Sequence, residues 1–218
     1  PIIVIKSEDG KIKEYPIDIK GYNIKIIVDK FTNDEYDDIL LYGKVNDTAG
    51  NIISRVYKYV QGELKEIFNE KIFLEKYKCL YSYLKDYKLE VEAPLEGRKY
   101  ILDISNMNQG DLNLIYDKSG RIINNKNLIF SNINKVELIK NIDYDLVSLK
   151  IYEKIINQNN NELGLIITDV SLEDQEVKVI EQYIAVYGQR NLEANKNYAI
   201  QEKIIEQLPN GAELINLN

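Results

Sequence analysis

The chain contains no histidine, no tryptophan and a single cysteine, Cys79, among its 218 residues. Without histidine, a Ser-His-Asp triad, a Cys-His pair and a His-ligated zinc or iron site are excluded within this chain. One cysteine excludes a four-cysteine cluster and any internal disulfide. No apolar run approaches the roughly 18 residues that indicate a transmembrane helix, so no membrane span is predicted.

The composition is that of an ordinary globular protein with an acidic balance. Hydrophobic residues make up 44% of the chain, and 35 Asp and Glu against 28 Lys and Arg give a net charge of −7. No nucleic-acid partner is expected, because binding to a phosphate backbone needs a clustered positive surface. Tyrosine outnumbers phenylalanine, 17 to 4. Exposed tyrosines can stack on sugars or form a recognition surface, and the alternative is that they lie half-buried on strands with their hydroxyls in water.

Short apolar or alternating runs, separated by turn residues, recur along the chain at the spacing of about 8–12 residues that is typical of all-β proteins. β-branched and aromatic residues dominate these runs. We predict a mainly β fold of antiparallel strands and hairpins, in a propeller-like or two-sheet arrangement with one or two short helices. The predicted strands cover residues 2–5, 12–19, 22–28, 39–45, 52–60, 64–68, 88–92, 100–104, 112–116, 122–123, 136–139, 146–156, 163–168 and 177–187.

Helical spacing of apolar residues is confined to two segments. Phe73 to Leu84 has apolar residues close to a 3.6-residue period, and Ala199 to Leu208 repeats the pattern before Pro209 ends it. Four prolines and eleven glycines leave no obvious linker. We therefore predict one β-rich domain over residues 1–218, in which residues 193–218 form a helical or extended appendage.

An acidic segment between two predicted strands is the candidate metal site. Asp29, Asn33, Asp37 and Asp38 lie between the run that ends at Val28 and the run that begins at Ile39. Calcium takes six to eight oxygen ligands from carboxylates, amides and carbonyls along a tightly turned loop. These four residues are the candidate ligands of a calcium ion, which is the one candidate cofactor; the alternative is that the loop keeps its shape without an ion.

The stretch from Asn33 to Ile39, with Asp29 as the opening acid, resembles the loop of FG-GAP/VCBS repeats, which has the form D-x-N-x-D-G-x-x-D between two strands. It departs from them at Glu35, where the family has glycine, and has one extra residue before Asn33. The resemblance implies a propeller-like fold, bound calcium in some members and a role in adhesion. In its texture and order of segments the chain also resembles surface lipoproteins of low-GC Gram-positive bacteria.

The residues favour a non-catalytic binding or adhesion-type module for protein or glycan. No P-loop, G-x-G-x-x-G or G-x-S-x-G motif is present. One alternative is a carboxylate-based hydrolase of glycan or cell-wall polymers, which needs two acids in a cleft. Another is a structural module of an envelope or spore assembly, which would expose a large apolar patch. The start at Pro1, without a Met or a signal segment, favours a mature extracytoplasmic or cell-surface portion with a lipid anchor upstream.

Overall fold

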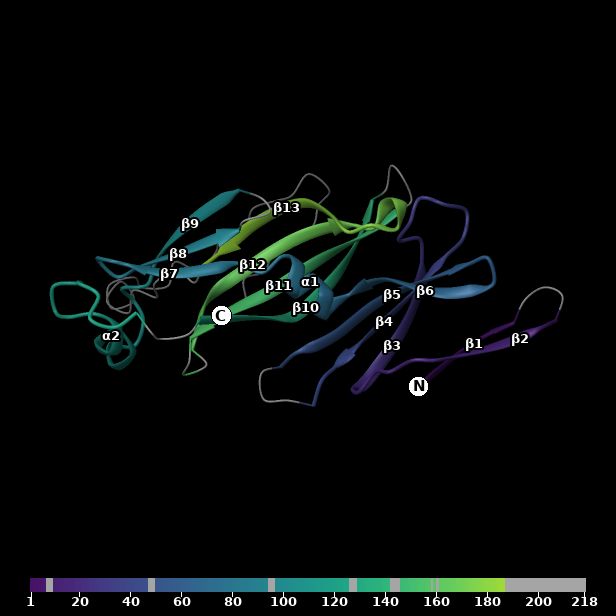
Figure 1. Cartoon of the computed structure of the whole chain (residues 1–218), viewed down its shortest axis with the longest axis horizontal. Helices are drawn as coiled ribbons and strands as arrows, with labels where there is room; N and C mark the ends of the chain where they lie inside the picture. The colour runs from purple at the N-terminus through teal and green to yellow at the C-terminus, as the bar shows by residue number, and fades with distance from the viewer. Residues whose placement is uncertain are drawn as a thin grey trace, which may run out of the picture. The chain divides into compact units, whose positions relative to one another are not determined.

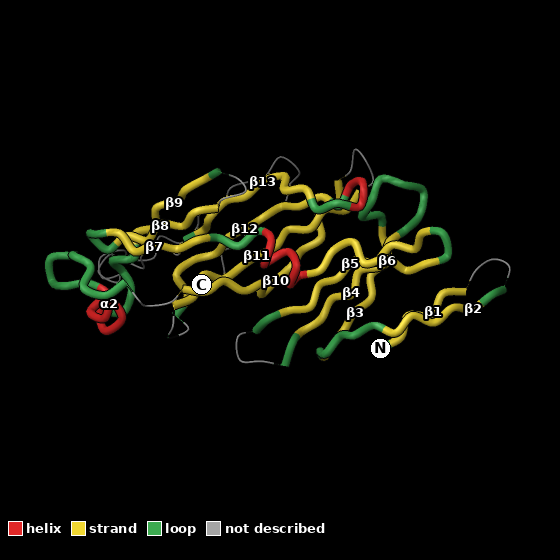
Figure 2. Tube along the Cα trace, viewed as in Figure 1, coloured by secondary structure: helices red, strands yellow, loops and turns green. Residues whose placement is uncertain are grey.

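The computed structural model describes residues 1–186, except 7–9, 47–49, 94–96, 126–128, 142–145, 158 and 160. The chain divides into two units, Pro1–Tyr187 and Gly188–Asn218, and the description concerns the first. Its described residues are mainly strand, arranged in four antiparallel sheets (Figures 1 and 2). No helix in this part of the chain is long and apolar enough to span a membrane.

The sheets follow one another in the sequence, and most neighbouring strands are joined as hairpins. The first sheet pairs β1 (Ile2–Lys6) with β2 (Ile12–Pro16), and the second has the order β3 (Tyr22–Asp29), β4 (Asp38–Lys44), β5 (Ile52–Val60) and β6 (Glu63–Asn69). Helix α1 (Glu70–Lys76) leads to the third sheet, β7 (Leu80–Leu84), β8 (Lys88–Ala93) and β9 (Arg98–Asp103). After helix α2 (Gln109–Ile115) comes the fourth sheet, β10 (Ile129–Asn141), β11 (Leu146–Asn157), β12 (Glu162–Ser171) and β13 (Lys178–Ala185), with a 3₁₀ turn, η1 (Glu173–Gln175), before its last strand.

The fourth sheet has the longest strands, and one face of its strand β11 packs against the protein core. Buried and half-buried residues alternate along the whole of β11, as expected for a strand with one face against a core. The buried residues are Val147, Leu149, Ile151, Glu153, Ile155 and Asn157.

Two different cores lie against this one face. Val147, Leu149 and Ile151 belong to the core that the fourth sheet shares with the second sheet and α1, through residues such as Leu40 and Phe73. Farther along the strand, Ile155 belongs to a second core, to which the third sheet and α2 also contribute.

The N-terminal hairpin covers the opposite face of the second sheet. Ile3, Ile17 and Ile19 contact Leu41 and Ile53, whose side chains point away from the first core. A two-stranded hairpin has little stability of its own, so its contacts with the second sheet hold it in place.

The predicted fold class is confirmed, because the described part of the chain is mainly β with antiparallel hairpins and two short α-helices, and its sheets share cores as in a two-sheet arrangement. Three predicted elements are wrong. The helix expected over residues 73–84 ends at Lys76 and is followed by β7, and the strand expected over 112–116 lies mostly in α2. The strand expected over 122–123 is only an isolated bridge between Ile122 and Tyr116. The predictions of a helix over 199–208 and an appendage over 193–218 lie outside the described residues.

Candidate functional site

The acidic segment predicted to bind calcium is the connection from β3 to β4. Asp29 ends β3, Asp38 begins β4, and the two residues are partners in the strand pairing. Asn33 and Asp37 lie on the exposed turn between them. The structure therefore brings two of the four predicted residues together and leaves the other two at the surface.

The carboxylate of Asp38 is fully buried and has protein partners at both oxygens. Its Oδ2 accepts hydrogen bonds from the backbone N–H of Phe31 (3.1 Å) and from the N–H and hydroxyl of Thr32 (both 2.9 Å). Its Oδ1 lies 3.5 Å from the ammonium of Lys58, which also pairs with Asp34. The hydrogen bond from Lys58 lowers the pKa of Asp34.

The ammonium of Lys58, which is on β5, thus places a positive charge beside the loop that was predicted to bind a calcium ion. In the described part of the chain, no three Asp, Glu or Cys side chains are grouped so that they could hold a metal. Calcium binding by Asp29, Asn33, Asp37 and Asp38 stays a prediction. The sequence does contain a signal for the ion pair, because Lys58 interrupts the apolar run of β5 and a buried ammonium needs an acidic partner.

A groove of about 540 Å³ lies beside the first half of β5. Four stretches that are far apart in the sequence line it: the segment before β3, β5 with the connection that precedes it, α1 and β10. The lining residues are Asp18, Lys20, Val45, Asn51, Ile52, Ile53, Arg55, Glu70, Lys71, Leu74, Ser131, Asn132 and Ile133. Its volume is within the roughly 300–1,000 Å³ of small-molecule sites.

The polar centre of the groove is the pair formed by Arg55 and Glu70. Glu70 is buried at the start of α1, and its Oε2 lies 3.6 Å from Arg55 Nε and accepts a hydrogen bond of 3.3 Å from the backbone N–H of Ser54. Arg55 also donates from Nη1 to the carbonyl of Asp18 (3.2 Å), but its buried Nε makes no hydrogen bond within the described residues. The centre thus retains an unused donor.

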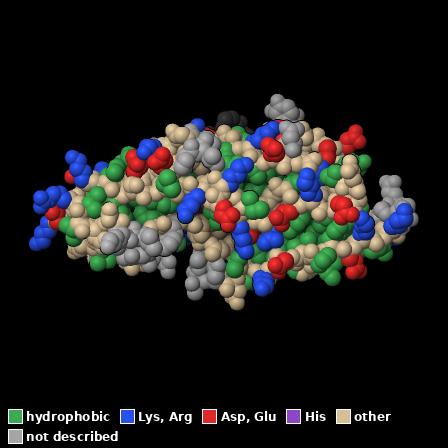
Figure 3. Space-filling view, in the orientation of Figure 1, with side chains coloured by type: hydrophobic (Ala, Val, Ile, Leu, Met, Phe, Trp, Pro, Cys, Tyr) green, Lys and Arg blue, Asp and Glu red, His purple; other side chains and the backbone are tan. Residues whose placement is uncertain are grey.

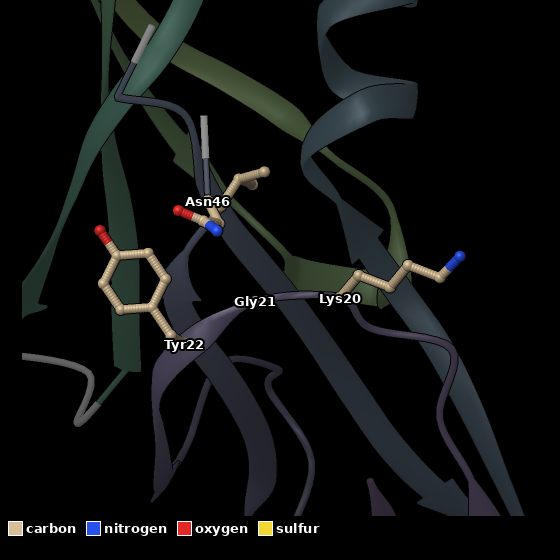
Figure 4. A pocket seen from close by; sticks show the side chains of 5 residues that line it. Lys20, Gly21, Tyr22 and Asn46 are labelled. Carbon is tan, nitrogen blue, oxygen red and sulfur yellow. The ribbon is translucent and has the colours of Figure 1, made fainter. Parts of the chain in front are cut away.

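A second hollow lies next to this groove, and both are lined by Lys20 and Val45. Figure 4 shows the ring of Tyr22 beside the side chain of Asn46, with Lys20 extending the other way from Gly21. Gly21 is required here, because a Cβ would lie 2.4 Å from Ile53 Cδ1 and 2.7 Å from the carbonyl oxygen of Lys44. The half-exposed Tyr22 ring is a candidate contact for a bound sugar or peptide.

Glu153 is the acid with the largest upward pKa shift among the described residues, but it lies inside the protein. It is 2% exposed, on β11 between the two cores, and burial raises its pKa from 4.5 to about 7, an effect that a hydrogen bond with Ser131 partly offsets. No other acid contributes to this shift. Glu153 therefore does not provide the pair of acids in a cleft that the hydrolase alternative needs.

These observations define a β-rich module with three sheets on shared cores and a polar groove beside one strand. The chain belongs to the family described as "YybI C-terminal domain", whose model matches residues 77–185. The match begins at the end of α1 and covers the third and fourth sheets with α2. The acidic segment, β5 and the residues of α1 that line the groove precede it.

The "Uncharacterized protein YybI" of Bacillus subtilis (strain 168) is 24% identical to this chain over 172 residues. The alignment covers 77% of this chain and 64% of that relative, so the chain spans less than two thirds of the relative's length. No solved structure matches the chain.

Proposed function

We propose that the chain is a non-catalytic binding module for a protein or a glycan, and that the groove beside β5 is its binding site. The observation that carries the proposal is the groove itself, which combines apolar residues with the Arg55–Glu70 pair and adjoins a second hollow lined by Tyr22. The lining offers charged and polar groups as well as apolar side chains to a ligand, and polar groups of this kind fix a bound ligand's orientation.

The test is a titration of the ¹⁵N-labelled full chain with tri-N-acetylglucosamine and, separately, with blocked hexapeptides. We expect amide shifts at residues 18–22, 51–55 and 131–133 with one of these probes. Lys71→Trp, which adds bulk at the rim, should weaken the binding, while Lys65→Trp on the exposed face of β6 should not. Shifts that are absent with all probes, or scattered over the surface, would overturn the proposal.

We also propose that the module acts outside the cytoplasm, at the cell surface or after secretion. The resemblance to surface lipoproteins supports this location, and Cys79 is compatible with it because its thiol is buried and protected from oxidation. Labelling of intact host cells with a membrane-impermeant amine reagent tests it. An epitope-tagged full-length protein that is labelled only after lysis would contradict an external location.

A structural role in an assembly is the second candidate, and the apolar surface near the N-terminus favours it. Ile2, Val4 and Ile12 of the hairpin, and Ile26 and Val28 of the outer strand β3, are all more than half exposed. In Figure 3, apolar side chains lie between charged side chains of both signs on the viewed face. If copies of the chain associate through this surface, light scattering should show a concentration-dependent increase in mass that Val4→Lys abolishes and Ile101→Lys, at an exposed position of β9, does not; a monomer at all concentrations would exclude it.

A further inference from the structure

The second sheet ends at an open edge, the strand β3. In the order of the sheet β3 is an outer strand that pairs only with β4, and no other strand in the described part of the chain lies along it (Figure 2). Ile26 and Val28 are 64% and 59% exposed, and Lys25 is exposed as well. The strand is therefore open to solvent on the side away from β4.

The N-terminal hairpin does not protect this edge, because it reaches toward the opposite side of the sheet. The hydroxyl of Tyr15 donates to the carbonyl of Gly62 (2.8 Å), in the turn between β5 and β6, and the Tyr15 ring lies edge-on to the ring of Tyr59. The connection from the hairpin to β3 is held at β5, where the carbonyl of Asp18 accepts from Arg55. The hairpin thus lies over β5 and β6 and leaves β3 uncovered.

β3 also lacks the features that keep an outer strand from pairing with another chain. Such strands usually carry several charges, a proline or a bulge along the edge. The other outer strand of this sheet, β6, has Glu63, Lys65 and Glu66 among its seven residues. In β3 the register shifts only before Lys25, and the regular segment that follows, Lys25–Asp29, has three apolar residues between one lysine and one aspartate.

The sequence of this segment, Lys-Ile-Ile-Val-Asp, is complementary to itself in the antiparallel direction. When two copies pair around a twofold axis at Ile27, Lys25 of each copy lies opposite Asp29 of the other, and Ile26 lies opposite Val28. Opposite charges and apolar side chains directly across an antiparallel pair stabilise it, whereas like charges destabilise it. No other twofold register places Lys25 opposite Asp29, so the charges select this one.

The folded chain presents the segment in a form that such a pairing can use. Ile26 and Val28 pair with Leu41 and Ile39 of β4, so the apolar side chains of a second copy would extend the same two rows and cover them. No ion pair in the described part of the chain includes Lys25, whose ammonium is available to a carboxylate. The backbone fits as well, because successive residues of a strand point their N–H and C=O to alternate sides and a pairing centred on one residue matches every outward group.

We propose that β3 is a dimerisation edge, at which residues 25–29 of two copies of the chain pair as antiparallel strands around a twofold axis at Ile27. The two four-stranded sheets then form one continuous sheet, through the isologous type of interface that is usual in homodimers. This pairing rests on the second candidate function, self-association, and does not depend on the groove beside β5.

The test is sedimentation equilibrium of the full chain over a range of concentrations. We expect the mass of the wild type to rise from 25.4 kDa toward twice that value. Lys25→Asp and Asp29→Lys each place like charges across the pair, so each variant alone should dimerise at least tenfold more weakly. An equimolar mixture of these two variants restores both ion pairs and should dimerise like the wild type. Lys65→Asp, at an exposed position of β6, is the matched control and should change the Kd less than twofold.

A wild-type chain that stays a monomer would overturn both this pairing and the second candidate function, and would leave the groove unaffected. A dimer that Val4→Lys disrupts and Lys25→Asp leaves unchanged would retain self-association through the hairpin but overturn the pairing of β3. Folded variants that fail to dimerise in the mixture would overturn it too. If Asp29→Lys does not fold, Lys25→Asp alone decides, together with concentration-dependent amide shifts of the wild type, which should fall at residues 25–29.

Discussion

The ammonium of Lys58 lies 3.5 Å from Oδ1 of Asp38, and both side chains are almost completely buried, with exposed fractions of 2% and 0%. An isolated buried charge is unstable, so each of these groups needs the other. The pair lies where the β3–β4 connection meets the first core, which includes Phe31. The acidity of this connection is therefore explained by a lysine of the same chain.

Replacement of Lys58 by methionine should destabilise the protein by about 3–5 kcal/mol, because it leaves the Asp38 carboxylate buried without its cation. Urea unfolding of the variant at neutral pH measures this loss. Lys25→Met removes an exposed lysine from β3 and should change the free energy of unfolding by no more than about 0.5 kcal/mol. A similar, small effect of both substitutions would show that Lys58 is not the counter-ion of Asp38.

Calcium should leave the thermal melt of the wild-type chain unchanged, because Lys58 already occupies the carboxylates of Asp34 and Asp38. An ion site at 100 times its Kd adds about 2.7 kcal/mol, which raises the Tm of a domain of this size by roughly 5–10 °C. Melts in EDTA and in millimolar calcium distinguish the two results. A rise of that size, lost in Asp29→Ala, would confirm the predicted calcium site and support the FG-GAP/VCBS resemblance.

The strands could be predicted because alternation in the sequence reports one buried face, as in Leu146–Asn157. The end of α1 could not, because Leu80 and Tyr81 continue the helical spacing and only their pairing with β8 selects a strand. For α2, the signal was present: Asn108 is an N-cap residue and Asp111 is an acid in the first turn, two features of a helix start that outweigh the alternation of residues 112–116. The groove was beyond prediction, since its walls come from residues 18–20, 51–55, 70–74 and 131–133, which only the tertiary fold brings together.

Glu153 should make the protein less stable as the pH rises from about 4.5 to 7. Its pKa is raised in the folded state, so the native protein holds this proton more tightly than the unfolded chain. The stabilisation is complete below the unfolded pKa and is lost as the pH passes through about 7, by a total on the order of 3 kcal/mol. The titratable groups beside it, Cys79 and Tyr81, have pKa values raised by burial and do not titrate in this range.

The measurement is urea unfolding of the wild type and Glu153→Gln at pH 5, 6, 7 and 8. The variant should be the more stable at pH 8, by an amount that shrinks toward pH 5, because glutamine carries no charge into the core. Glu14→Gln, at an exposed position of β2, should follow the wild type at every pH. A constant difference between wild type and Glu153→Gln would refute the proton linkage.

Cys79 should not react with a disulfide reagent in the folded protein. Its side chain is 2% exposed, and burial raises its pKa to about 12, with a further contribution from the charge of Glu153. The thiolate, which is the reactive form, is therefore nearly absent at pH 8. The control is Ser82→Cys in a Cys79→Ala background, which places a thiol at an exposed position of β7 and should react within minutes. If Cys79 of the wild type reacted as fast as this exposed thiol, the third sheet would have to open readily.

Asp111 should be the most sensitive residue of α2. Its carboxylate accepts hydrogen bonds from the side-chain amides of Asn157 (3.4 Å), Asn159 and Asn161, at the turn between β11 and β12. The turn is also closed from within, because Asn157 Oδ1 accepts from the backbone N–H groups of Asn159 and Asn161, both at 2.9 Å. Asp111 thus joins the helix to the far end of the fourth sheet.

Asp111→Ala leaves the buried amide of Asn157 without this acceptor, which should cost about 1–3 kcal/mol. Hydrogen exchange at the backbone amides of Asn159 and Asn161 should become faster, because the turn loses its attachment to α2. Asn113→Ala removes an exposed side chain of the same helix and tests whether the effect is general to α2; its free energy of unfolding should stay within about 0.5 kcal/mol of the wild type. If the two variants are equally stable and exchange at the turn is unchanged, the helix is held by Leu112 and Ile115 in the second core, and the polar contacts contribute nothing measurable.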